Sequence, residues 1–479
     1  MVLVAAFHLA TIREGQDWGD DFSMYVRHAE NLARGVPYAE TGYVYNPHNP
    51  AVGPRTYPPG FPLLLAPIVK VFGRALGPMK VLIVASLAGS LLLLLRLFRG
   101  VLPSPHLEAL VLTTGFSPVV WEFKDQILAD IPFLFFVLAS LACFTQTALP
   151  DTPARRRLVY GVLTGSFTYV AYETRVLGIV LAPTFLAHDL IRYRRIGLQT
   201  AAACAVFILL AGAQYVVWLG DRSYLDQLTV TAASLERNVF DYARSLSDLW
   251  ANGYWDGGRK AFFLLASGLA ALGYAKAVRA GAGWPEVFPW LYIAPVILWP
   301  SYQGIRFLLP LIPFYLYYCL LGARHLDAAV HRRLGRRNVV FGGLAAAVAL
   351  TYVGQYSTLQ FGRFPSGVGR PENMAFFEFI KSATDPNAVF VFSKPRALAL
   401  FTERRASAPF TPADPCLLWR YLATIDASYV VTGPDEPYFD VAYLHRFVDQ
   451  YRDDLSLVWQ SSEVAVYRVE RNPCEPGEQ

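Results

Sequence analysis

Charged residues are scarce in this sequence. Asp, Glu, Lys and Arg make up 16% of its 479 residues, whereas soluble domains contain roughly 25%. Hydrophobic residues make up 54% and occur in long runs that stop near residue 357. This excludes an ordinary soluble protein and predicts a membrane domain over residues 1–357, followed by a small soluble domain over 358–479.

Motifs of several enzyme and transporter classes are also missing. The sequence contains no glycine-rich phosphate loop, no Cys-x-x-Cys pair and no nucleophile elbow. It shows no internal repeat, which disfavours a repeat-built transporter, and no cleavable signal pattern.

Cysteine is rare as well, with five residues in the chain. Cys143, Cys204 and Cys319 lie in apolar runs and are interpreted as small hydrophobic residues. Cys416 and Cys474 lie in the tail, where a disulfide can form if the tail is extracytoplasmic.

The apolar runs predict about eleven membrane-spanning helices. The first run has about 12 residues, whereas a spanning helix needs about 20. We therefore expect either that the natural start lies upstream or that loop residues complete this helix. The spans lie at about 1–12, 80–98, 106–122, 131–149, 158–174, 176–191, 198–219, 261–279, 284–300, 305–322 and 338–356.

Arg and Lys clusters predict the orientation of these spans. Under the eleven-span scheme the clusters all fall in loops on one side, which is then cytoplasmic. The +5 net charge is therefore a topology signal rather than a sign of nucleic-acid binding. The first loop, about 13–79, the loop 220–260 and the tail fall on the other side. We predict a multi-pass protein of the cell (inner or plasma) membrane with an extracytoplasmic C-terminal domain. The clusters are Arg96 and Arg99; Arg155 to Arg157; Arg192, Arg194 and Arg195; Lys276 and Arg279; and Arg324, Arg332, Arg333, Arg336 and Arg337.

Secondary structure is predicted outside the spans too. The first loop contains a helix at 21–34, ended by Gly35 and Pro37, and an apolar stretch at 63–72 that is too short to span and is expected to lie along the interface. The tail is predicted to be a small α/β domain. Its predicted helices lie at 371–383, 414–425 and 438–451, and its predicted strands at 388–393, 429–432, 455–460 and 464–469.

Three carboxylates in the first loop are the most informative feature for function. Asp17, Asp20 and Asp21 follow directly after the first span. Transfer of a sugar from a lipid phosphate needs a base for the acceptor hydroxyl, and a phosphate is already a good leaving group when cations hold it. One carboxylate base with Arg or Lys therefore suffices. The alternative is that Asp20 or Asp21 caps the helix that follows.

The order of features resembles the GT-C glycosyltransferases of the protein O-mannosyltransferase and lipid A aminoarabinose-transferase group. That group has an acidic motif four residues before a Tyr in the first extracytoplasmic loop. This chain has Asp21-Phe-Ser-Met-Tyr25, with Phe22 where a second acid is common and with Asp20 in front. Three more segments are similar to segments of the group: Tyr57-Pro-Pro-Gly-Phe-Pro, Asp130-Ile-Pro-Phe and Arg306-Phe-Leu-Leu-Pro. The resemblance covers about residues 1–357.

The resemblance implies an inverting transferase that moves a hexosyl or pentosyl unit from a polyprenyl-phosphate-linked donor. The acceptor is a hydroxyl on a lipid, glycan or protein at the extracytoplasmic face. It implies Asp21 as the base, with Asp20 second, and Asp130 in the same cavity. Arg306 and Arg175 suit the donor phosphate because a guanidinium offers paired hydrogen bonds. Lys124, Glu173 and Tyr57 complete the candidates for substrate binding.

Purely structural roles are the alternative for several of these residues. Asp130 can cap a helix, and Arg175 and Arg306 can reach the membrane interface from span ends. His48 alone is a poor metal ligand, so no metal is predicted, although some relatives bind a divalent ion and the resemblance leaves that option open. A transporter or flippase for a lipid-linked saccharide is the alternative function, and a scaffold whose tail binds a partner is a third hypothesis.

Overall fold

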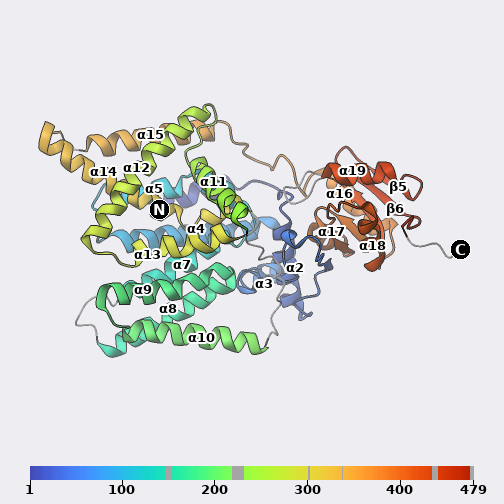
Figure 1. Ribbon diagram of the computed structural model, residues 1–479, viewed down its shortest axis with the longest axis horizontal. Coiled ribbons are helices and arrows are strands. Elements are labelled where there is room, and N and C mark those ends of the chain that lie inside the picture. Colours follow the sequence, from blue (N-terminus) through green and yellow to red (C-terminus); the bar gives the residue numbers. More distant parts are fainter. Residues whose placement is uncertain (147–152, 218–230, 300–301, 337, 434–440, 475–479) are drawn as a thin grey trace. The chain divides into compact units, whose positions relative to one another are not determined.

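The protein is described by a computed structural model that covers residues 1–146, 153–217, 231–299, 302–336, 338–433 and 441–474. The chain forms two compact units. The helical unit comprises Met1–Ile12, Gly77–Gly220 and Val230–Gly362, and the α/β unit contains Arg13–Leu76 and Arg363–Gln479 (Figure 1). Parts of six predictions lie outside the described residues: the span ends at 147–149, 218–219 and 300, the loop start at 220–230, Arg337 of the last basic cluster, and the helix start at 438–440.

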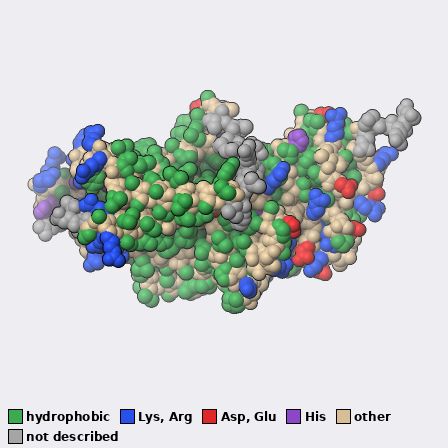
Figure 2. Space-filling model, turned by 90° about the horizontal axis from the view of Figure 1, so that it is seen from below, with side chains coloured by type: hydrophobic (Ala, Val, Ile, Leu, Met, Phe, Trp, Pro, Cys, Tyr) green, Lys and Arg blue, Asp and Glu red, His purple; other side chains and the backbone are tan. Residues whose placement is uncertain are grey.

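The helical unit has helices at the positions of the predicted apolar runs. Within the described residues, five helical segments are long and apolar enough to cross a membrane: Leu76–Phe98, Val176–Tyr193, Leu198–Val216, Asp256–Gly281 and Val339–Tyr356. On the face seen in Figure 2, hydrophobic side chains cover most of the helical unit, and Lys and Arg side chains gather at one of its ends. This indicates a helical membrane protein, and the full count of eleven crossings stays a prediction. The helices are α1 Val2–Ala10, α4 Leu76–Phe98, α5 His106–Gly115, α6 Pro118–Lys124, α7 Asp130–Thr145, α8 Ala154–Thr174, η2 Val176–Val180, α9 Leu181–Tyr193, α10 Leu198–Val217, α11 Ala232–Asp248, α12 Asp256–Gly281, α13 Trp284–Leu298, η4 Gly304–Leu308, α14 Ile312–Leu334 and α15 Val339–Tyr356.

One predicted span is two helices in the structure. The stretch 106–122 is divided into α5 and α6 because the chain leaves the helix at Phe116 and Ser117, and Pro118 begins the next helix. Proline suits the first position of a helix but cannot donate a hydrogen bond in its interior. An apolar run alone does not reveal this break.

Two glycines bring α12 and α14 together. A Cβ atom on Gly273 would collide with the backbone oxygen of Tyr318, and a Cβ atom on Gly322 would collide with the oxygen of Leu269. Small residues allow such close backbone approach between helices in a membrane.

The α/β unit combines the first loop with the C-terminal segment. Its six-stranded sheet has the order β1-β3-β2-β4-β6-β5. Strands β1, β3, β2 and β4 run parallel, and β6 and β5 are antiparallel additions at one side. Its elements are α2 Asp20–Arg34, β1 Tyr43–Val44, η1 Pro50–Val52, α3 Gly60–Phe72, α16 Pro371–Ala383, β2 Val389–Phe392, α17 Pro395–Thr402, β3 Arg405–Ser407, α18 Pro415–Thr424, β4 Ala427–Thr432, α19 Val441–Gln450, β5 Leu455–Gln460 and β6 Ala465–Val469.

Strand β1 makes the first loop part of this sheet. Tyr43 and Val44 pair with Ala406 and Ser407 of β3, and the Ser407 hydroxyl donates to the Val44 carbonyl at 2.8 Å. The side chain of Asn46 adds a 2.7 Å hydrogen bond to the carbonyl of Ala408. The contacts thus group residues 13–76 with the C-terminal segment, a division that differs from the predicted boundary at 357 and 358. Where the membrane begins stays a prediction.

The predicted elements of the tail are confirmed within the described residues. Strand β2 is fully buried, as its run of hydrophobic residues indicates, and Trp419 of α18 and Phe447 of α19 lie in the core beside it. Cys416 and Cys474 form a disulfide. The short elements α17, β3 and β1 were not predicted.

Candidate active site

Helix α2 presents Asp20 and Asp21 in its first turn. The N-cap is Gly19, and no side chain caps the helix. Instead, Asp17 accepts a 3.0 Å hydrogen bond from the Gly19 amide in the turn before it. The helix ends at Gly35, whose φ of 68° favours glycine. The interpretation that Asp20 or Asp21 caps this helix is therefore wrong.

Asp20 binds the start of a different helix. Its Oδ1 accepts a 2.9 Å hydrogen bond from the amide of Ala397, the third residue of α17. Helix α17 has no side-chain cap of its own, and the first amides of a helix need acceptors and favour negative charge. Asp20 therefore fastens the C-terminal segment to the first loop.

Asp21 lies in a hydrogen-bonded group with Tyr57 and Arg396. The Tyr57 hydroxyl donates to Asp21 Oδ1 at 2.5 Å, and Arg396 Nη1 donates to the same Oδ1 at 3.2 Å and to the Tyr57 oxygen at 2.7 Å. The Asp21 side chain is 22% exposed, against 1% for Arg396. Asp21 is thus a positioned carboxylate that keeps some access to solvent.

Arg396 is a buried cation between two aromatic rings. Its guanidinium carbon lies 4.8 Å from the Tyr43 ring centre and 5.0 Å from that of Tyr57. Burial opposes the charge, but Tyr57, Tyr43 and the carboxylates of Asp20 and Asp21 raise the pKa of Arg396 above its ordinary value. Arg396 was not predicted, because no sequence motif marks it; Pro395 at the first position of α17 is the signal for the helix that carries it.

His28 holds the backbone of Tyr57. The Tyr57 amide donates to His28 Nε2 at 3.2 Å, so this nitrogen carries no proton. Nδ1 then donates to the Tyr38 carbonyl at 2.9 Å. Burial lowers the pKa of His28 from 6.5 to about 3, so the ring stays neutral. His28 was also missed, because a lone histidine in a helix carries no motif.

Asp130, Arg175 and Arg306 form a second cluster, in the helical unit. Arg175 Nη1 lies 2.9 Å from Asp130 Oδ1, and Arg306 Nε lies 3.6 Å from the same oxygen. Asp130 is 2% exposed and begins α7 without capping it. Both guanidinium groups thus face the same buried carboxylate, and guanidinium groups suit an anion such as phosphate. Its union with Asp21 in one cavity stays a prediction.

Lys124 and Glu173 lie in other surroundings. The Lys124 ammonium contacts Asp125 at 2.5 Å and donates to the Thr11 carbonyl at 2.7 Å, which makes it a buried ion pair. Glu173 accepts a 2.7 Å hydrogen bond from Gln214. Their predicted roles in substrate binding stay predictions.

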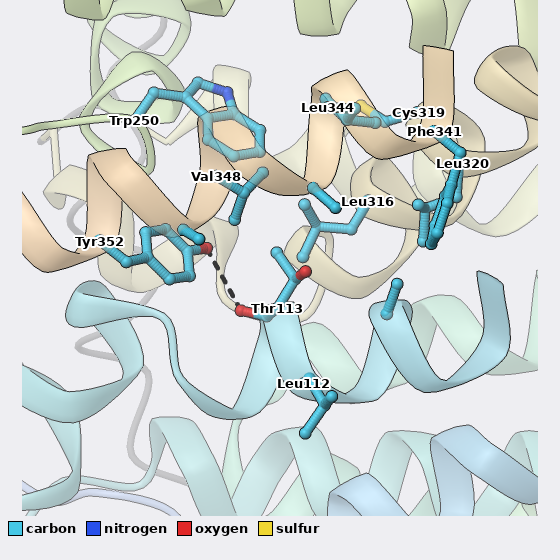
Figure 3. A pocket seen from close by; sticks show the side chains of 13 residues that line it. Leu112, Thr113, Trp250, Leu316, Cys319, Leu320, Phe341, Leu344, Val348 and Tyr352 are labelled. Atoms are coloured by element: carbon cyan, nitrogen blue, oxygen red, sulfur yellow. Dashed lines mark hydrogen bonds between the residues drawn. The ribbon is translucent and has the colours of Figure 1, made fainter. Parts of the chain in front are cut away.

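An apolar cavity lies elsewhere in the helical unit. Its volume is about 300 Å³, and its lining includes Trp250, Leu316, Phe341 and Tyr352 (Figure 3). The Tyr352 hydroxyl donates to the Thr113 carbonyl at 3.2 Å. None of the lining residues is Asp, Glu, Lys, Arg or His, so no charged side chain in this lining could hold a phosphate.

No family model and no curated protein matches the sequence. Solved structures do match. ArnT from Cupriavidus metallidurans, bound to undecaprenyl phosphate, has a TM-score of 0.61 at 14% identity, with 98% of this chain and 97% of that chain covered. The oligosaccharyltransferase AglB from Archaeoglobus fulgidus, in complex with an inhibitory peptide and a dolichol-phosphate, has a TM-score of 0.57 at 14% identity, with 90% and 68% covered. This chain has the GT-C fold. Arabinofuranosyltransferase AftD from Mycobacteria, at a TM-score of 0.57 and 13% identity, has 40% of its length covered by 98% of this chain.

One of the similar proteins was also solved with a metal ion. The Archaeoglobus fulgidus oligosaccharyltransferase was also solved in complex with Zn and sulfate. In the part of this chain that the structure describes, no group of three or more His, Cys, Asp or Glu side chains is arranged to hold a metal ion.

Proposed function

We propose that this protein is an inverting glycosyltransferase that moves a sugar from a polyprenyl-phosphate-linked donor to a hydroxyl acceptor at the extracytoplasmic face of the membrane. The position of Asp21 carries the proposal, because a partly exposed carboxylate is held by two buried partners at the start of a helix. The GT-C fold supports it, since ArnT with this fold was solved bound to undecaprenyl phosphate.

In this mechanism Asp21 accepts the proton of the acceptor hydroxyl. The acceptor oxygen then forms a bond to the anomeric carbon of the sugar while the bond between that carbon and the phosphate oxygen breaks. Polyprenyl phosphate leaves with the electron pair, and the displacement inverts the anomeric centre. A single base suffices, whereas glycoside hydrolysis uses a pair of carboxyl groups.

Arg306 and Arg175 would stabilise the charge that develops on the leaving phosphate. Asp130 contacts both guanidinium groups and helps to position them. Charge-assisted hydrogen bonds from arginine suit phosphate oxygens. We assign this cluster to the donor and Asp21 to the acceptor.

Asp20 is the weaker candidate for the base. Its Oδ1 is engaged by the Ala397 amide, and its side chain is 12% exposed, against 22% for Asp21. The disulfide between Cys416 and Cys474 supports an extracytoplasmic position for the α/β unit, because disulfides persist in oxidising compartments.

The test measures release of free polyprenyl phosphate by the purified protein with a panel of polyprenyl-phosphate sugars. Asp21→Asn should lower the rate by about 10²- to 10⁴-fold, the usual contribution of a general base. Asp17→Asn is the matched control, because an asparagine oxygen can still accept from the Gly19 amide. Full activity in Asp21→Asn would refute the base assignment, and no release from any donor by the wild type would refute the reaction.

A further inference from the structure

A large cavity lies at the ends of the helices opposite Asp130. Its volume is about 830 Å³, and its lining includes Phe144 and Thr145, the last residues of α7 before its C-cap. Asp130 is the first residue of the same 16-residue helix. At about 1.5 Å per residue the two ends are roughly 24 Å apart. The cavity is therefore separate from the cluster of Asp130 and the two arginines.

Positive charge predominates in this cavity. Five cations line it, from four helices and one loop: Arg157, Arg192, Arg195, Lys276 and Arg324. Among the residues that the structure describes, Arg192, Arg195 and Lys276 have no carboxylate within ion-pair distance. These groups are available to a ligand.

Two carboxylates also line the cavity, but uncharged donors engage them. Asp189 Oδ2 accepts from the Gly197 amide at 2.7 Å, and Glu286 Oε2 accepts from the Gly283 amide at 2.8 Å. Both acids are buried, at 5% and 7% exposure. Because they serve the local backbone, they neutralise the five cations only in part, and the lining keeps an excess of positive charge.

The inner wall of the cavity is apolar. Phe144, Trp284, Tyr317 and Leu321 line it, and all four are buried. A free inorganic anion has no apolar part that could pack against this wall. A lipid can place its phosphate among the cations and its apolar part against the aromatic rings. Basic pockets between membrane helices on the cytoplasmic side are typical sites for anionic lipid headgroups.

We propose that this cavity binds the phosphate headgroup of an anionic lipid at the predicted cytoplasmic side. Membrane topology accounts for arginines in the loops. It does not account for five cations from separate elements around one cavity with an aromatic wall. The site is distinct from the proposed catalytic cluster and does not depend on the proposed reaction.

The test is native mass spectrometry of the purified full chain with phosphatidylglycerol or phosphatidylcholine. We expect preferential binding of phosphatidylglycerol. The double variant Arg192→Gln, Arg195→Gln should bind it roughly 10- to 30-fold more weakly, since each basic residue near an anionic lipid contributes about 1 kcal/mol. Arg332→Gln, Arg333→Gln is the matched control: it removes the same charge from the same predicted side, at positions that do not line the cavity.

Three outcomes would overturn the proposal. Equal weakening in both double variants would assign the effect to general surface charge. Equal binding of the two lipids by the wild type would exclude recognition of the anionic headgroup. Displacement of phosphatidylglycerol by millimolar inorganic phosphate would assign the cations to a free anion rather than a lipid. None of these outcomes bears on the release assay with Asp21→Asn, so the two proposals fail separately.

Discussion

Replacing Arg396 with glutamine would remove the guanidinium that lies 3.2 Å from Asp21 and 3.7 Å from Asp20. Loss of one partner from a buried ion pair costs about 3 to 5 kcal/mol. Both carboxylates keep some exposure, which places the expected cost near the lower end, about 3 kcal/mol. For a unit of this size that corresponds to a fall in melting temperature of about 6 to 12 °C.

The same variant should change the pH profile of the proposed reaction. A cation close to a carboxylate favours its charged form, so removing the cation lets the carboxylate take up a proton at higher pH. The acid limb of the rate of lipid phosphate release should therefore move to higher pH. Arg396→Lys keeps the charge and should leave the acid limb nearly in place while still lowering the melting temperature.

Arg404→Gln is the control that separates stability from catalysis. Arg404 is also buried, at 8% exposure, but it donates to the carbonyls of Lys381 and Thr384 rather than to a carboxylate. The Arg404→Gln variant should lower the melting temperature without moving the acid limb of the pH profile. If Arg396→Gln lowers the melting temperature and also leaves the acid limb unmoved, Arg396 is purely structural and the reasoning is refuted.

Three further predictions follow from contacts elsewhere in the chain. Arg306→Lys should raise the KM for the lipid donor about tenfold, because the ammonium loses the paired hydrogen bonds of the guanidinium; a normal KM in donor titrations would contradict its phosphate role. Gly322→Leu should lower the melting temperature in detergent by several degrees, because a side chain would collide with α12, whereas Gly342→Leu, in open space, should not; equal melting of the two variants would count against the close packing. His28 is neutral in the fold with a pKa of about 3, so the unfolded chain binds its proton first, and stability should fall as the pH drops from about 6.5 to about 3. His28→Asn should flatten that part of a melting-against-pH curve, and an unchanged slope would contradict the assignment.

Much of the fold could be predicted from the sequence, because apolar runs and buried strands are local signals. The run of hydrophobic residues at 388–393 identified β2, and Pro371 marked the start of α16. Strand β1 could not be predicted. It has two residues, and its partner β3 lies more than 350 positions away along the chain.

Residues of the candidate site were predicted where a local motif marks them, and Arg396 and His28 were not, because no motif marks either residue. Asp21 was found because the first loop carries a family-like motif, and Asp130, Arg175 and Arg306 proved to be neighbours. Arg396 is 375 residues away from Asp21, and an ion pair across that separation leaves no pattern in either segment.

Strand β1 also has a consequence for how the protein is made. The Val44 carbonyl receives its hydrogen bond from Ser407, 363 residues later. A ribosome adds roughly 5 to 20 residues per second, so the first loop must wait roughly 20 to 70 s before its partner strand exists. During that interval Asp20 and Asp21 lack both the α17 amide and the Arg396 guanidinium. A nascent chain stalled before residue 395 would therefore carry the acids without the arrangement that positions them.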